Sequence, residues 1–252
     1  MAIIYGIQLY TLRGYLKKPD QVRGVFEKCR ALGADTVQVS GMCDMDAKEL
    51  DGIAKDNNLT ICGTHSPYER VVGDTDRLAE EHLTYGCRNI GIGSMPGEFR
   101  GGKDKLDKFI GIYNETALKL EKYGITLAYH NHAFEFSDIT DGVTMFDYLI
   151  ENFDKRVQFI PDTYWIKFAK RDVFEYLKKL KGRANLIHLK DYKKKLFLPL
   201  MCEIGYGKID FKEVVRIAGE IGTKWAVVEQ DISKDAYKSL EMSMNYIRNN
   251  LK

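Results

Sequence analysis

The stretch Ile-Thr-Leu-Ala-Tyr-His-Asn-His at residues 125–132 begins with apolar residues and ends in two histidines. Three later segments share that layout: Gln-Phe-Ile-Pro-Asp at 158–162, Asn-Leu-Ile-His-Leu-Lys-Asp at 185–191 and Trp-Ala-Val-Val-Glu-Gln-Asp at 225–231. Such apolar runs are typical of buried parallel strands. Because each run leads to a residue that can ligate a metal, four strands would deliver His, Asp, His and Glu to one end of a sheet. This pattern indicates a cation site.

Short apolar runs alternate with longer amphipathic ones along the whole chain. The expected strands are Ile4–Leu9, Thr36–Val39, Thr60–Thr64, Asn89–Gly93, Thr126–His130, Gln158–Pro161, Leu186–Leu189 and Ala226–Glu229. The expected helices include Asp20–Leu32, Lys105–Tyr123, Asp172–Leu180, Phe211–Ile221 and Ala236–Ile247. Residues 1–252 are therefore expected to form one α/β domain, a single (β/α)8 TIM barrel, a fold that typically has about 250 residues. An open doubly wound sheet is the alternative.

The composition describes a globular protein without a bias toward charged partners. Apolar residues make up 44% and charged residues 29%, and the formal net charge is only +2. This balance gives no reason to expect nucleic acid or an anionic membrane as a partner. Five scattered cysteines, the lack of a signal sequence and the lack of a long apolar run predict a reduced, cytoplasmic protein that does not span a membrane.

The predicted metal ligands are His130, Asp162, His188 and Glu229. Side chains alternate across a strand, so that these residues can all point into the mouth of the barrel. Any one of them alone would more often be a structural polar group. Four at matching strand ends favour a metal, since unpaired buried charges cost several kcal/mol each. Two imidazoles and two carboxylates suit Mn²⁺, Co²⁺ or Zn²⁺ better than Ca²⁺.

Five further residues are candidates for catalysis or substrate binding. His132 is interpreted as a general base or as a residue that orients a ligand. Lys190 could hold a substrate oxygen or pair with the glutamate ligand. Gln8 and His65 could donate hydrogen bonds to sugar hydroxyls, and Trp165, expected in a loop, could pack against a sugar ring. Each of these three could equally be structural.

Three other segments invite interpretation. The lysines of 193–195 could attract a phosphate, although such a run is usually a solvated loop. The apolar loop of 196–201, which includes Phe197, is interpreted as a lid over the pocket or as a contact between subunits of a homo-oligomer. The glycines of 205–211 precede a helix with Asp210 as its expected N-cap, and they are not a nucleotide fingerprint, because no P-loop lysine-serine pair appears.

Five motifs carry a resemblance to a known family. They are GIQLYTLR at 6–13, PDT at 161–163, HLKD at 188–191, GYGKIDF at 205–211 and VE at 228–229. With them the chain resembles, over essentially its whole length, the sugar phosphate isomerase/epimerase family of xylose isomerase-like barrels. The resemblance implies a divalent metal held at these strand ends, most often Mn²⁺, with Co²⁺, Zn²⁺ or Mg²⁺ as alternatives, and a small sugar as substrate.

One departure from the family pattern lies at His130. Family epimerases usually place a glutamate there, which works with the glutamate of the last strand as a two-base pair; here only Glu229 is present. Related keto-acid and keto-inositol dehydratases are similar in having a histidine where His132 stands. The leading hypothesis is a metal-dependent isomerase or epimerase of a keto-sugar or a related polyol or sugar derivative, acting through an enolate-type intermediate. The alternative is a metal-dependent lyase, a dehydratase or β-eliminase of keto-inositols or 3-keto-glycosides.

Two other functions fit the sequence less well. Tri-zinc apurinic endonucleases share this barrel, but they need more ligands than a chain of five histidines supplies, with His82 expected in mid-helix. A non-catalytic sugar-binding protein would follow if the change at His130 weakened the metal site.

Overall fold

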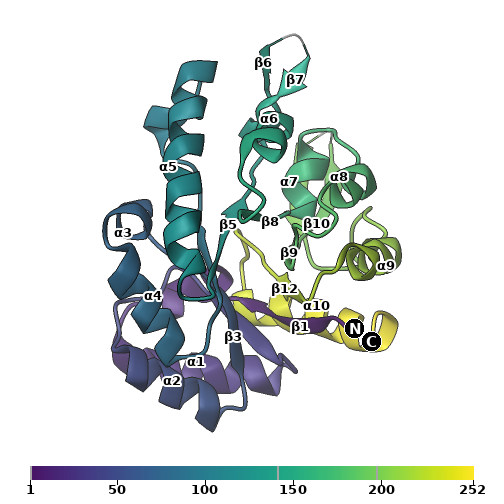
Figure 1. The fold of residues 1–252 in the computed structure, drawn as a ribbon. Coiled ribbons are helices and arrows are strands. Elements are labelled where there is room, and N and C mark those ends of the chain that lie inside the picture. Colours follow the sequence, from purple (N-terminus) through teal and green to yellow (C-terminus); the bar gives the residue numbers. More distant parts are fainter. Residues whose placement is uncertain (1, 141, 197) are drawn as a thin grey trace.

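Eight parallel strands form the central sheet in the computed structural model, which describes residues 2–140, 142–196 and 198–252 (Figure 1). Neighbouring strands follow the order β8 (Gln158–Ile160), β5 (Thr126–His130), β4 (Asn89–Ile92), β3 (Thr60–His65), β2 (Thr36–Val39), β1 (Ile4–Gln8), β12 (Trp225–Val228) and β9 (Leu186–Leu189). Every pairing in this order is parallel, as the apolar runs predict.

The strands at the two ends of this order, β8 and β9, also meet each other. The backbone N–H of His188 donates to the C=O of Pro161 (3.0 Å), and Asp162 and His188 form a parallel bridge. At the other end of the contact, the N–H of Phe159 donates to the C=O of Arg183 (2.7 Å). The sheet therefore closes on itself. The predicted (β/α)8 TIM barrel is confirmed, and the alternative of an open sheet is wrong.

Helices connect the strands around the outside of the barrel (Figure 1). The α-helices are α1 (Pro19–Ala31), α2 (Ala47–Asp56), α3 (Tyr68–Gly73), α4 (Thr75–Thr84), α5 (Lys103–Glu121), α6 (Met145–Asn152), α7 (Thr163–Phe168), α8 (Val173–Lys179), α9 (Phe211–Ile221) and α10 (Ala236–Asn250). The 3-10 helices in the described segments are η1 (Leu9–Tyr15), η2 (Gly97–Phe99) and η3 (Phe134–Phe136). Within the described parts of the chain, none of the helices has both the length and the apolar character needed to cross a membrane.

Helix α9 shows how the sequence sets these elements. The predicted N-cap Asp210 accepts hydrogen bonds from the N–H groups of Lys212 and Glu213. Gly222 ends the helix with a φ of 96°, a left-handed conformation that glycine adopts without strain. The side chains that pack on the barrel recur at helical spacing: Phe211, Val214, Ile217, Ala218 and Ile221.

Two short hairpins extend from the barrel and were not predicted. One is formed by β6 (Asp138–Thr140) and β7 (Val143–Thr144), the other by β10 (Asp191–Lys195) and β11 (Leu198–Cys202). The prediction of a loop over 196–201 is therefore wrong for residues 198–201, because they belong to β11, which pairs with the lysine-rich strand β10. Phe197 lies outside the described residues. Leu198 is 65% exposed, whereas Met201 faces the cavity described below.

A small apolar cluster lies inside the barrel and is made of Cys62, Ala128, Ile160, Leu186 and Val227. The last four of these stand two residues before the four predicted metal ligands. Because alternate residues of a strand point to the same side, the ligands form the next layer toward the carboxyl ends of the strands. The apolar layer thus serves as the floor of the candidate site.

Candidate metal centre

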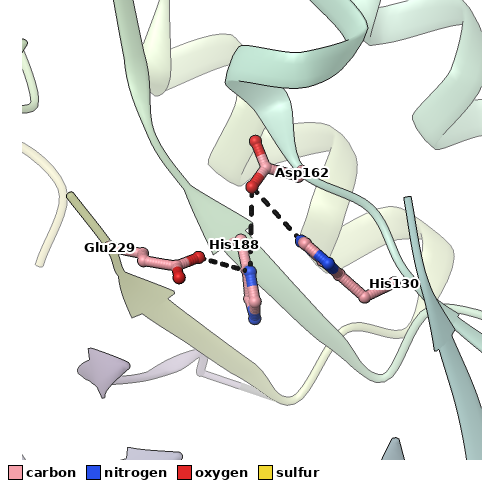
Figure 2. A group of neighbouring side chains, drawn as sticks. All are labelled: His130, Asp162, His188 and Glu229. Carbon is pink, nitrogen blue, oxygen red and sulfur yellow. Dashed lines mark hydrogen bonds and ion pairs between the residues drawn. The ribbon is translucent and has the colours of Figure 1, made fainter. Parts of the chain in front are cut away.

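One donor atom from each of His130, Asp162, His188 and Glu229 lies within 4.8 Å of the others (Figure 2). His130 and His188 belong to β5 and β9, and Glu229 directly follows β12. Asp162 follows β8 after one proline. All four side chains are buried. The structure therefore brings the four predicted ligands together at the carboxyl end of the barrel.

The two carboxylate oxygens of Asp162 have different partners. Oδ1 accepts hydrogen bonds from the N–H groups of Tyr164 (3.0 Å) and Trp165 (3.1 Å), because Asp162 is the N-cap of α7. Oδ2 lies 3.4 Å from His130 Nε2 and 3.8 Å from His188 Nδ1 (Figure 2). The helix thus holds one oxygen and fixes the other toward the centre of the cluster. Trp165 stands in this helix rather than in the expected loop.

Gln38, buried in β2, orients the ring of His188. His188 Nε2 lies 2.6 Å from Gln38 Oε1, so that in the neutral ring, with this amide orientation, Nε2 donates and Nδ1 keeps its lone pair. Nδ1 faces Glu229 Oε2 at 2.9 Å and has no hydrogen-bond donor among the described residues, while Glu229 Oε2 also lies 2.9 Å from Lys190 Nζ. Two buried electron-pair donors that face each other are stabilised by a cation. These residues therefore fit a divalent metal ion.

The charges around the cluster keep its carboxylates ionised. Burial alone would raise the pKa of Glu229 and of Asp162, but the Lys190 ammonium and the neighbouring histidines lower both pKa values well below their usual range. Burial lowers the pKa of His130. Burial would also lower the pKa of His188, but the Glu229 and Asp162 carboxylates raise it. Two anionic oxygens and two imidazoles therefore converge on one point.

Lys190 is fully buried beside this cluster. Its Nζ lies 2.9 Å from Asp162 Oδ2, 2.9 Å from Glu229 Oε2 and 3.0 Å from Asp231 Oδ1. Burial would lower the pKa of Lys190, but these three carboxylates raise it, so that the ammonium is charged. The predicted pairing with Glu229 is present, and the structure adds two partners.

His132 lies beside the cluster. Its ring centroid is 4.8 Å from that of His130 and 5.5 Å from that of Trp165. Nδ1 is buried without a hydrogen-bond partner among the described residues, and burial lowers the pKa of His132 to about 3. Glu135 fixes the backbone here, because its Oε2 accepts from the His132 N–H (2.8 Å) and its Oε1 from the Tyr129 hydroxyl (2.7 Å).

A cavity of about 530 Å³ adjoins the cluster and is large enough for a small organic ligand. The predicted site residues that line it are Gln8, His65, His130, His132, Trp165, Lys190 and Glu229. Gln8 Nε2 and His65 Nδ1 lie 3.4 Å apart. Lys193 and Lys194 are absent from the described wall of this cavity, which gives no support for a phosphate site there, and the side chain of Lys195 lies outside the described part of the structure.

Three residues of the site were missed in the sequence: Gln38, Asp231 and Glu135. Asp231 stands two residues after Glu229, the same spacing that singled out His132 after His130, and that signal could have identified it. Gln38 is a polar residue in an otherwise apolar strand, which marks it as buried but does not name its partner. Glu135 has no comparable signal, because its partners depend on how the chain turns after β5.

Comparisons with known proteins agree with this architecture. A family model for the xylose isomerase-like TIM barrel matches residues 26–249. No curated protein matches the sequence. Among solved structures, a sugar phosphate isomerase/epimerase from Parabacteroides distasonis ATCC 8503 is similar, with 21% identity, a TM-score of 0.83 and coverage of 100% of this chain and 96% of that chain.

Two further similar structures come from different enzymes. The probable 3-DHS dehydratase AsbF from Bacillus anthracis shares 12% identity with a TM-score of 0.76, over 98% of this chain and 100% of that chain. The D-psicose 3-epimerase from Clostridium cellulolyticum H10 shares 15% identity with a TM-score of 0.72, over 99% of this chain and 100% of that chain. At these identities the likeness is one of fold. Because the family model covers most of the sequence, the chain belongs to the xylose isomerase-like TIM barrel family.

Proposed function

We propose that the protein is a metal-dependent isomerase or epimerase of a keto-sugar, or of a related polyol or sugar derivative, and that its reaction passes through an enolate-type intermediate. The observation that carries this proposal is the convergence of four metal-ligating side chains beside a cavity that His132 and Lys190 also line. Mn²⁺ is the first choice of metal. When bound, such a cation would polarise a sugar carbonyl and make the neighbouring C–H more acidic.

Glu229, His132 and Lys190 carry the proposed proton chemistry. Glu229 or His132 removes the proton next to the carbonyl, and the same group or water returns it. His132 is assigned this role because its ring lines the cavity beside the metal group. Lys190 lines the cavity, and its positive charge would stabilise the oxygen that gains charge in the enolate-type intermediate.

Gln8, His65 and Trp165 are proposed to bind the sugar. Gln8 Oε1 accepts from the N–H of Tyr10, which leaves its amide nitrogen to face His65 and the cavity. His65 Nε2 has no hydrogen-bond partner in the described part of the chain. Both groups can therefore form hydrogen bonds with sugar hydroxyls, while the ring of Trp165 packs against the C–H groups of the sugar.

The charges of the cavity favour an uncharged reacting end of the substrate. The cations that line the cavity are Lys190 and Arg13. Lys190 contacts three carboxylates, and Arg13 donates to the C=O groups of Tyr10 (2.9 Å) and Asp231 (3.0 Å). Lys190 is the cation beside the metal group and its charge is already balanced by carboxylates, whereas Arg13 bonds only neutral C=O groups and keeps its charge. A sugar without a phosphate near its carbonyl is therefore the better substrate.

The rim of the cavity favours a second candidate function. Tyr10, Trp165, Met201 and Ile232 give it an apolar outer wall, and Ile232 is 81% exposed. Such a wall suits an aglycone or a second ring attached to the reacting sugar. A lyase that expels a β-hydroxyl or a glycosidic oxygen from a 3-keto-glycoside or a keto-inositol would use the same cluster.

Incubation with a panel of keto-sugars, keto-inositols and 3-keto-glycosides in D₂O with added Mn²⁺ tests both candidates. Deuterium incorporation seen by NMR without an enone absorbance would support the isomerase or epimerase, whereas growth of the enone absorbance would support the lyase. His188→Ala should abolish either reaction. Equal activity of the metal-stripped enzyme and the Mn²⁺-loaded enzyme would refute metal dependence.

A further inference from the structure

The ammonium of Lys190 contacts the oxygens that the candidate metal centre would use. Its Nζ lies 2.9 Å from Asp162 Oδ2 and 2.9 Å from Glu229 Oε2. The lysine side chain is only 2% exposed, so that water hardly screens its charge. A divalent cation held by this cluster would share both carboxylate oxygens with an ammonium group.

A third carboxylate contacts the same ammonium from outside the cluster. Asp231 Oδ1 and Oδ2 lie 3.0 Å and 3.1 Å from Lys190 Nζ, and Asp231 lines the cavity with a side chain that is 20% exposed. Among the described residues, Asp231 is the carboxylate partner of Lys190 that does not also belong to the four-residue metal group.

The formal charges show what this third carboxylate does. Asp162, Glu229 and Asp231 carry three negative charges, Lys190 carries one positive charge, and the two histidines serve as neutral ligands. The group therefore has a net charge of −2, which one divalent cation cancels. Without the charge of Asp231, the loaded group would carry a buried excess positive charge, which a low-dielectric site disfavours.

We propose that Lys190 and Asp231 form an ion pair that sets the metal affinity of the centre. Lys190 competes with the metal for Asp162 and Glu229. Asp231 draws the ammonium toward the cavity, so that the ammonium and the metal ion can be present together. This inference rests on the proposed metal-dependent function, and it adds to that function two residues that control metal loading without acting as ligands.

A double-mutant cycle on metal affinity tests the pair. Metal-stripped wild type, Asp231→Asn, Lys190→Met and the double variant are titrated with Mn²⁺ and with Zn²⁺ at pH 8 against a chromophoric chelator, and thermal unfolding without metal checks that each variant folds. Asp231→Asn should bind metal roughly 10- to 100-fold more weakly, which is the usual loss of metal affinity when a residue that orients a metal ligand is replaced. Lys190→Met should bind more tightly. In the Lys190→Met background, Asp231→Asn should change the affinity by about threefold or less.

Asp235→Asn is the matched control. Asp235 belongs to the same loop, and its Oδ1 accepts a hydrogen bond from the N–H of Lys238 at the start of α10, a role that asparagine can keep. Asp235→Asn removes the same formal charge as Asp231→Asn but does not change a partner of Lys190. The metal affinity of this variant should therefore stay at the wild-type value.

Each outcome decides for or against the pair. Equal affinities of Asp231→Asn and Asp235→Asn would overturn the inference, and this comparison suffices if Lys190→Met does not fold. Weaker binding by Lys190→Met would also overturn it. Metal binding by Lys190→Met but not by the wild type would support the competition while contradicting the proposed metal-dependent function. No binding by either protein would refute that function and this inference together.

Discussion

Asp191 accepts four backbone hydrogen bonds, and its replacement by asparagine should destabilise the protein strongly. Oδ1 accepts from the N–H groups of Tyr192 (2.7 Å) and Ile209 (3.2 Å), and Oδ2 accepts from those of Gly205 (3.0 Å) and Gly207 (2.8 Å). The side chain is fully buried. One carboxylate thus ties the segment that leads to α9 to the first strand of the β10–β11 hairpin, and this hairpin carries Met201 to the cavity.

The cost follows from the number of bonds that an amide cannot make. Asparagine keeps one acceptor oxygen, but its NH₂ group would face two backbone N–H groups, so that two hydrogen bonds to a charged oxygen are lost. Each such bond contributes about 1.5–3 kcal/mol, which gives a loss of at least about 3 kcal/mol. In a protein of this size that corresponds to a fall in Tm of roughly 6–12 °C. Burial raises the pKa of Asp191, so the measurement belongs at pH 8, where the carboxylate is ionised.

Urea unfolding and calorimetry of Asp191→Asn beside Asp210→Asn test this reasoning. Asp210 uses a single oxygen to cap α9, and asparagine caps a helix about as well as aspartate, so the control should lose less than about 0.5 kcal/mol. A loss below about 1 kcal/mol for Asp191→Asn would show that the four contacts do not hold the segment. A similar loss in both variants would point to a general effect of charge instead.

Three further predictions concern stability, metal and substrate. Burial lowers the pKa of His82 from 6.5 to about 4, so the unfolded chain binds a proton that the folded chain does not, and stability should fall by about 3 kcal/mol as the pH drops from about 6.5 to 4. His82→Gln should remove that part of the pH slope in urea unfolding, and an unchanged slope would contradict the assignment. Mn²⁺ should raise the Tm of the wild type in proportion to RT ln(1 + [Mn²⁺]/Kd) but leave His188→Ala unchanged, so that an equal rise in both would place the metal elsewhere. Trp165→Ala should raise KM about tenfold with a smaller change in kcat, as expected for lost uniform binding, whereas an unchanged KM would remove Trp165 from the substrate site.

The strands that hold the site could be predicted closely from the sequence. The observed bounds of β2, β5 and β9 agree with those expected from the apolar runs, because a strand of a closed parallel barrel is covered on both faces. The β10–β11 hairpin could not be predicted, since its pairing of lysines with leucines depends on a neighbour rather than on an internal pattern. The partners of Gln38 and Asp231 come from strands distant in sequence, and only the closed barrel brings them together.

The histidine at the end of β5 changes which groups can carry a proton at this centre. His130 Nδ1 lies 3.2 Å from the C=O of Gly93, and its Nε2 faces Asp162 Oδ2. With Nδ1 donating to the carbonyl and Nε2 turned toward the cluster, His130 cannot replace the base that a glutamate provides at this position in the epimerases that the chain resembles. His132 has a ring nitrogen without a hydrogen-bond partner among the described residues, and Glu229 is shared by His188 and Lys190. For the proposed reaction we therefore infer proton transfer by one base on one face of the substrate, as an isomerase or a lyase needs, rather than inversion between two opposed carboxylates.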